Sequence, residues 1–125
     1  MNHTLVLFDI DGTLLLTAGA GRRAILRAVG EEVQAGAAIE QVRFDGKTDP
    51  QIVMELLAAA GHPEPREPRL VARLTERYVA LLAEELESPA GATTVLPGIV
   101  ELLDRLEEER GVVLGLLTGN VVPGA

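Results

Sequence analysis

The sequence predicts an α/β protein whose parallel sheet is interrupted by a helical insertion. Two apolar runs of strand length, Thr4 to Phe8 and Val112 to Leu117, each lead into a polar turn that contains glycine. Continuous apolar runs are typical of strands in parallel sheets, which helices cover on both faces. A crossover between parallel strands needs only about a dozen residues, but most of the chain lies between these two runs. Because this connection is much longer than a crossover requires, it predicts additional structure inserted between the two strands.

Helical periodicity begins soon after the first strand, which we expect to lie centrally in the sheet. From Ala20 to Val33, apolar residues recur at the spacing of a helix. A second helix should begin at Thr48 or Asp49, either of which can cap it, and end at Gly61. The residues expected to be buried along this second helix are Ile52, Val53, Leu56 and Leu57.

The second half of the connection contains two more amphipathic segments. A proline-rich run over 62–68 predicts a stiff link to a long helix from Arg69 to Glu87. The residues expected to be buried there are Leu70, Leu74, Tyr78, Leu81, Leu82 and Leu86. Pro97-Gly98 should open the last helix, the crossover to the second strand, and Gly111 should end it. Its inward residues are expected to be Ile99, Leu102, Leu103 and Leu106.

These elements divide the chain into two predicted parts. Residues 1–16 and 90–125 form the sheet core, and residues 17–89 form the helical insertion. Short joints that contain glycine, over 18–21 and 89–91, connect the two parts. Such joints would let the insertion close over a ligand bound at the sheet.

Composition excludes several classes of function. A net charge of −8 and a pI near 4.7 argue against binding to nucleic acid, which needs a basic surface, and against an anionic membrane surface. The sequence has no apolar run long enough to span a bilayer and no signal-peptide pattern, so we expect a cytoplasmic protein. The absence of cysteine excludes disulfides, thiolate metal sites and cysteine nucleophiles. No sequence feature encodes an oligomeric state.

The turn after the first strand concentrates reactive groups. Asp9 and Asp11 flank Ile10 at the carboxyl end of the strand, where α/β sheets bind ligands. Gly12 and Thr13 follow, and their backbone N–H groups could face an anion. This combination suits attack on a phosphate beside a hard metal ion. An Asp-Gly pair alone is an ordinary turn signal, so the interpretation depends on the whole run over 8–14.

Three segments carry a resemblance to a known family. Asp9-Ile10-Asp11-Gly12-Thr13-Leu14 resembles the first signature of the haloacid dehalogenase superfamily, and Leu116-Leu117-Thr118-Gly119-Asn120 resembles its second. Between them, Phe44-Asp45-Gly46-Lys47-Thr48-Asp49 lies in a region that resembles the helical cap of the phosphoglycolate phosphatase and phosphoglucomutase branch. The resemblance implies a Rossmann-like parallel sheet core, present only in part, with the inserted helices as its cap.

The resemblance also implies roles for the motif residues. Asp9 would be the nucleophile that forms an aspartyl-phosphate, and Asp11 would be the general acid and base. Both would hold Mg²⁺, Asp9 through its side chain and Asp11 through its backbone carbonyl. Thr118 and the amides of Gly119 and Asn120 would bind the phosphate, although an ordinary turn is the alternative for these three. Dehalogenases lack an aspartate at the position of Asp11, so the pattern favours phosphoryl transfer.

In the cap region, Lys47 is the candidate for substrate recognition. It is the only lysine in the sequence, it follows Gly46, and it precedes a predicted helix N-terminus, which favours anions. A solvated surface lysine is the alternative. The expected partner is a small phosphorylated metabolite.

The family's third and fourth motifs supply a lysine and further acidic metal ligands. No lysine or acid follows Thr118 in this sequence, which ends at Ala125. We therefore expect the 125-residue chain alone to show little phosphatase activity. Three functions stay open: a Mg-dependent phosphatase acting on phosphoglycolate-like compounds or sugar phosphates, a phosphoglucomutase-type phosphotransferase, and a non-catalytic fragment or interaction module that keeps a phosphate-binding turn.

Overall fold

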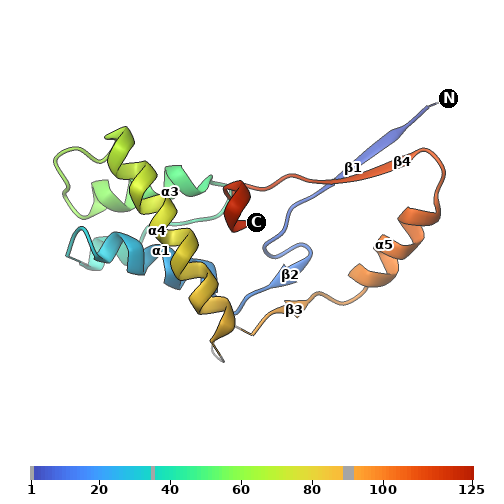
Figure 1. Cartoon of the computed structure of the whole chain (residues 1–125), viewed down its shortest axis with the longest axis horizontal. Coiled ribbons are helices and arrows are strands. Elements are labelled where there is room, and N and C mark those ends of the chain that lie inside the picture. The colour runs from blue at the N-terminus through green and yellow to red at the C-terminus, as the bar shows by residue number, and fades with distance from the viewer. Residues whose placement is uncertain (1, 35, 89–91) are drawn as a thin grey trace.

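Strands and helices follow one another along the chain largely as the sequence predicts. The computed structural model describes residues 2–34, 36–88 and 92–125. In chain order its elements are β1 (Thr4–Phe8), β2 (Leu15–Leu16), α1 (Ala20–Gly30), α2 (Ala37–Glu40), α3 (Asp49–Ala59), α4 (Pro68–Glu87), β3 (Thr94–Val95), α5 (Ile99–Glu108), β4 (Val112–Leu116) and the 3-10 turn η2 (Val122–Gly124). Helices α1, α3 and α4 gather at one end of the molecule, β1, β4 and α5 lie toward the other, and β2 and β3 lie between (Figure 1).

The two predicted strands pair in parallel. Thr4 lies opposite Val112 and Phe8 opposite Leu116, and α5 packs against β4 as the crossover helix. Just beyond the paired segment, the Leu117 N–H donates to the Phe8 carbonyl at 2.8 Å. The turns that follow β1 and β4 therefore begin side by side.

The prediction that β1 lies centrally in the sheet, covered on both faces, is wrong. Within the described residues β1 pairs with β4 alone, and the side chains of Leu5 and Leu7 are 60% and 46% exposed. The expected burial of α5 is wrong too, because no residue of that helix is buried. A two-stranded sheet is too narrow to cover the apolar stripe of a helix and both of its own faces.

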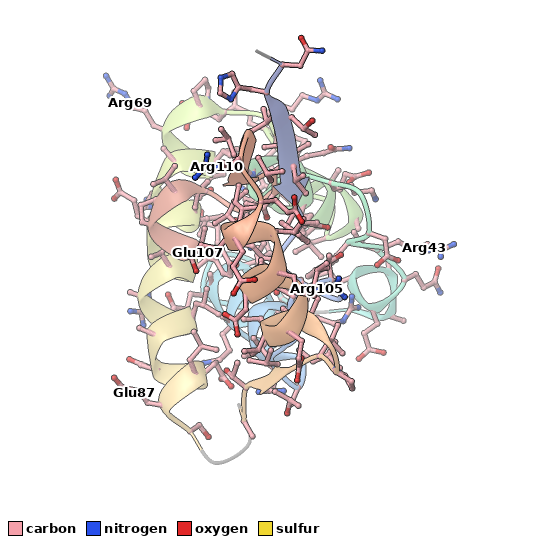
Figure 2. The ribbon with its side chains drawn as sticks, turned by 90° about the vertical axis from the view of Figure 1, so that its right-hand side faces the viewer. Arg43, Arg69, Glu87, Arg105, Glu107 and Arg110 are labelled. Atoms are coloured by element: carbon pink, nitrogen blue, oxygen red, sulfur yellow. The ribbon has the colours of Figure 1, made fainter. Side chains whose placement is uncertain are left out.

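The charged run at the end of α5 lies in solvent. Glu107, Glu108 and Glu109 are all exposed. Figure 2 views this end of the molecule, where Arg105, Glu107 and Arg110 project from the neighbourhood of α5. No helix in the part of the chain that the structure describes is long and apolar enough to cross a membrane.

The buried core lies mainly in the helical region. The stripe predicted for α3 is confirmed, and the apolar periodicity of α1 is confirmed up to Val29, whereas Val33 is only partly buried. The core comprises Ala20, Ala24, Ile25, Ala28, Val29, Ile39, Ile52, Val53, Leu56, Leu57, Leu70, Val71, Leu74, Tyr78, Leu81 and Leu82. Leu86, which was expected in this stripe, is 40% exposed. Helices α1 and α4 run antiparallel, and Arg23 near the start of α1 pairs with Glu85 near the end of α4. Leu86 therefore lies at the edge of the packed surface between the two helices.

Ion pairs set the antiparallel register of α1 and α4. Near the start of α1, Arg23 pairs with Glu85 at 2.8 Å, and Arg27 lies 3.0 Å from the same carboxylate. Beyond the other end of α1, Glu31 pairs with Arg77 at 2.9 Å. Exposed pairs each contribute only about 0–1 kcal/mol, so apolar burial supplies the stability while these pairs select the alignment.

Several local features differ from the predictions. Helix α1 ends at Gly30 rather than Val33, and the pairing of β2 with β3, the short helix α2 and the turn η2 were not expected. The joint predicted over 18–21 is shorter than expected, because α1 begins at Ala20, which is fully buried. The joint predicted over 89–91 lies outside the described residues. The division into residues 1–16 with 90–125 and residues 17–89 stays a prediction.

The core assignment predicts that Leu81→Ala lowers the free energy of unfolding by about 2–5 kcal/mol, the usual cost of a cavity at a fully buried leucine. Leu81 is 0% exposed. Leu86→Ala, on the same helix, should cost less than about 1 kcal/mol. Urea unfolding followed by circular dichroism measures both, and equal losses would contradict this packing.

Candidate active site

Three segments meet at one cavity: the first turn, which follows β1, the second turn, which follows β4, and the cap-region loop over 44–49. It has a volume of about 1020 Å³, and its lining includes the predicted site residues Asp9, Asp11, Gly12, Gly46, Lys47, Thr118, Gly119 and Asn120. Parallel pairing of β1 with β4 explains the contribution of the two turns, which lie at the same edge of the sheet. Thr13, also predicted to bind phosphate, is not part of the lining.

The turn after β1 presents two exposed carboxylates. Ile10 between them is buried, with 8% of its surface exposed, and holds the turn against the protein. Its N–H donates to Asp9 Oδ1 at 2.9 Å, which fixes the orientation of that carboxylate. The side-chain amide of Asn120 donates to Asp11 Oδ2 at 3.1 Å. The carboxylate of Asp11 is therefore held from the second turn.

The N–H groups predicted to face an anion after Asp11 are already used within the turn. Gly12 donates to the Leu15 carbonyl at 2.9 Å, and Thr13 donates to the Ile10 carbonyl at 3.2 Å. Gly12 has a φ of 77°, a conformation that glycine adopts without steric cost. Phosphate binding by these two amides stays a prediction, and it requires exchange of both bonds for bonds to the anion.

The turn after β4 is organised by its own threonine. The Asn120 N–H donates to Thr118 Oγ1 at 3.1 Å. The Thr118 hydroxyl accepts this bond and keeps its own proton to donate to a phosphate oxygen. Phosphate binding by Thr118, Gly119 and Asn120 stays a prediction, and the structure adds a second role for Asn120, the contact of its side chain with Asp11.

The donor set at Asp9 and Asp11 fits a hard cation. Mg²⁺ prefers oxygen ligands and is commonly held by one or two carboxylates, with substrate phosphate and water completing the shell. The described residues contain no cluster of three or more acidic, histidine or cysteine side chains that could hold a metal alone. A site built on these two aspartates needs further oxygen ligands, such as phosphate or water, to complete the shell of the ion.

The cap-region loop places Lys47 at the cavity. Its side chain is 22% exposed, and Nζ lies 3.0 Å from Glu55 Oε2. That oxygen is buried and accepts no hydrogen bond of good geometry among the described residues, so the contact is electrostatic. Lys47 is not the solvated surface residue of the alternative interpretation. Whether it recognises substrate stays a prediction.

The same loop touches the second turn through its backbone. A Cβ added at Gly119 would clash with the Lys47 carbonyl oxygen and would lie 3.2 Å from Thr48 Cα. Asp49 donates its N–H to the Gly119 carbonyl at 2.9 Å. Only glycine permits so close an approach of the two segments.

The sequence did not indicate that two buried residues, Asp49 and Tyr78, line this cavity. Thr48 or Asp49 was expected to cap α3; Thr48 is the cap, accepting from the Gln51 N–H at 3.4 Å, while the Asp49 carboxylate accepts from the Val121 N–H at 2.8 Å. Burial raises the pKa of Asp49, and the charge of Asp11 adds to the rise. Tyr78 was predicted only as a core residue. Burial, followed by the charges of Asp49 and Asp11, raises the pKa of its phenol, which is neutral at physiological pH.

Comparison with known proteins agrees with the class that this geometry defines, an α/β protein with a parallel strand pair and acidic residues at the end of its first strand. The family model for haloacid dehalogenase-like hydrolases matches residues 3–125. The chain belongs to this family. It is 32% identical over 118 residues to proteins named phosphoglycolate phosphatase from Cereibacter sphaeroides, including strains ATCC 17029 and KD131. The match covers 94% of this chain and 51% of each relative, so the chain spans about half their length.

A solved structure shows the same fold. The crystal structure of a predicted phosphoglycolate phosphatase from Haemophilus somnus 129PT superposes with a TM-score of 0.66 at 17% sequence identity. The superposition covers 98% of this chain and 54% of that protein. The helical insertion and the parallel pair are therefore arranged as part of a haloacid dehalogenase-like fold.

The close approach at Gly119 predicts that Gly119→Ala is destabilising by about 1–3 kcal/mol, because the added methyl group has to displace backbone atoms rather than a flexible side chain. Gly30→Ala is the matched control, since nothing lies within 4 Å of a Cβ added there. Thermal unfolding of both variants tests this, and a Gly119→Ala variant as stable as the parent would contradict the contact.

Proposed function

We propose that the cavity is the active site of a Mg²⁺-dependent phosphatase that acts on a small phosphorylated metabolite, such as phosphoglycolate or a sugar phosphate. The observation that carries the proposal is the convergence of Asp9, Asp11, Thr118 and Lys47 on one cavity from segments far apart in the sequence. The names of the relatives support the substrate class, and membership of a hydrolase family supports the reaction class.

In the proposed reaction, Asp9 attacks the phosphorus atom through a carboxylate oxygen. A bond forms between this oxygen and phosphorus while the ester bond to the leaving alkoxide breaks, which leaves an aspartyl-phosphate. Asp11 in its protonated form gives its proton to the alkoxide. As a carboxylate, Asp11 then takes a proton from the water that cleaves the aspartyl-phosphate, and this regenerates Asp9 and releases phosphate.

The neighbouring groups set up these two roles. The Ile10 N–H orients the Asp9 carboxylate, and the Asn120 amide holds Asp11 Oδ2, so the other oxygen of Asp11 carries the transferred proton. Mg²⁺, held by the Asp9 side chain and the Asp11 backbone carbonyl, would supply charge neutralisation on the phosphoryl group. The Thr118 hydroxyl would donate to a phosphoryl oxygen.

Lys47 would contact a second anionic or polar group of the substrate. Its ammonium lines the cavity while Glu55 balances its charge through a contact of poor hydrogen-bond geometry. An anionic substrate group can replace that contact with a better one. Charge-assisted hydrogen bonds are the stronger class, so the exchange favours binding of an acidic metabolite.

The nucleophile assignment predicts that Asp9→Asn lowers phosphate release by roughly a thousandfold or more, because an amide is a poor nucleophile and a poor metal ligand. Phosphate release from phosphoglycolate with Mg²⁺ should be measured on residues 1–125 and on the product of the complete reading frame that encodes them. Asp104→Asn on α5, which is exposed, is the control and should retain turnover. An active Asp9→Asn enzyme would exclude this mechanism.

The recognition assignment predicts that Lys47→Ala raises KM for phosphoglycolate by roughly ten- to a hundredfold, the loss expected for a hydrogen bond to a charged group. KM for an aryl phosphate that carries no second charged group should change little. Arg69→Ala removes a positive charge from an exposed position on α4 outside the cavity and serves as control. Equal changes in KM for the two substrates would show that Lys47 does not bind the second anionic group of the substrate.

A further inference from the structure

The side chain of Asp49 is charged and buried at the start of α3. Among the described residues it is the only charged side chain classed as buried, with 4% of its surface exposed. A buried carboxylate is costly unless hydrogen bonds or a counter-ion compensate it. No ion pair involves Asp49 in the described part of the chain, and the nearby charge of Asp11 is of the same sign. Its compensation comes from a backbone N–H group.

Capping of α3 does not account for this carboxylate. Thr48 occupies the cap position and its hydroxyl accepts from the Gln51 N–H. The Asp49 carboxylate instead accepts from the Val121 N–H at 2.8 Å, across a sequence separation of 72 residues. An aspartate in the first turn also interacts favourably with the helix dipole, but that interaction does not require contact with the second turn.

Two bonds that run in opposite directions clamp the second turn. The Asp49 N–H donates to the Gly119 carbonyl, and the Asp49 carboxylate accepts from the Val121 N–H. Asn120 lies between these two anchor points, and its side chain holds Asp11. Hydrogen bonds therefore run without interruption from the first residue of α3, through the second turn, to the proposed general acid.

We infer that Asp49 is a positioning residue through which the cap region sets the conformation of the phosphate-binding turn. Both bonds are made by α3, so movement of α3 away from the sheet breaks them together. Among the described residues, the turn then keeps its own Thr118–Asn120 bond and the bond from the Asn120 side chain to Asp11. Docking of the cap region against the sheet and ordering of the phosphate-binding turn are therefore coupled. The effect on phosphate rests on the proposed function, whereas the effect on the turn does not.

The inference assigns the function of Asp49 to its acceptor oxygen rather than to its charge. An asparagine keeps an oxygen acceptor at the same place and removes the electrostatic repulsion by Asp11. Asp49→Asn should therefore preserve the turn, whereas Asp49→Ala should release it. Val121 offers a second test from the other side of the bond. Its φ of −64° is the value that proline adopts, so Val121→Pro deletes the donor without changing this angle.

The first measurement is amide hydrogen exchange by NMR on the 125-residue chain. In Asp49→Ala, exchange of the Val121 amide should accelerate about five- to tenfold relative to the amides of β4, the change expected for loss of one hydrogen bond. In Asp49→Asn it should stay within about twofold of the parent, since that variant keeps the bond. An unchanged rate in Asp49→Ala, or equal acceleration in both variants, would overturn the inference.

The second measurement is binding of orthophosphate with Mg²⁺, followed by the chemical shifts of the Gly119 and Asn120 amides. Asp49→Ala and Val121→Pro should each weaken binding about five- to tenfold, and the double variant no more than either alone, because both delete the same bond. Asp49→Asn and Val121→Ala should bind as the parent does. Additive losses would overturn the inference. If the parent itself binds no orthophosphate, the proposed function fails, and hydrogen exchange alone decides the role of Asp49.

Discussion

The parallel pairing of β1 with β4 is the constraint on which the rest of the structure depends. Parallel strands present their carboxyl ends at the same edge, so the turn carrying Asp9 and the turn carrying Thr118 begin side by side, joined by the bond from Leu117 to Phe8. Parallel pairing also requires a crossover, which α5 supplies. The additional helices α1 to α4 leave the sheet after the first turn and return before the crossover, and this route brings the loop over 44–49 to the cavity.

Stability and reactivity are separated in space. The buried apolar side chains are concentrated in α1, α3 and α4, while the reactive carboxylates lie at the end of a strand pair whose leucines are largely exposed. The site therefore takes its rigidity from the helical region through contacts such as the one between α3 and the second turn. Polar groups in these contacts are satisfied by backbone partners, which costs less than leaving buried groups unpaired.

Apolar periodicity made the strands, four helices and most of the core predictable, because each stripe depends only on local spacing. The four residues predicted to be buried on α3 are all buried. Burial of α5 was not predictable in the same way, because an amphipathic pattern shows which side would be covered but not whether a covering surface is present. The paired turns were predictable from the motif residues. The bond between Asp49 and Val121 was not, since local spacing offered helix capping as a complete explanation for that aspartate.

The arrangement of charge at the cavity explains why so much of the site is held by neutral backbone groups. Asp9, Asp11 and Asp49 gather around a place where a phosphate dianion is proposed to bind, while Lys47 already has Glu55 beside it. Each added carboxylate raises the cost of bringing an anion there, and the charge of Asp11 adds to the rise that burial causes in the pKa of Asp49. A divalent cation offsets this repulsion only while it is bound. The turn that meets the phosphate is therefore best fixed by N–H and carbonyl groups whose geometry does not depend on whether the metal or the substrate is present.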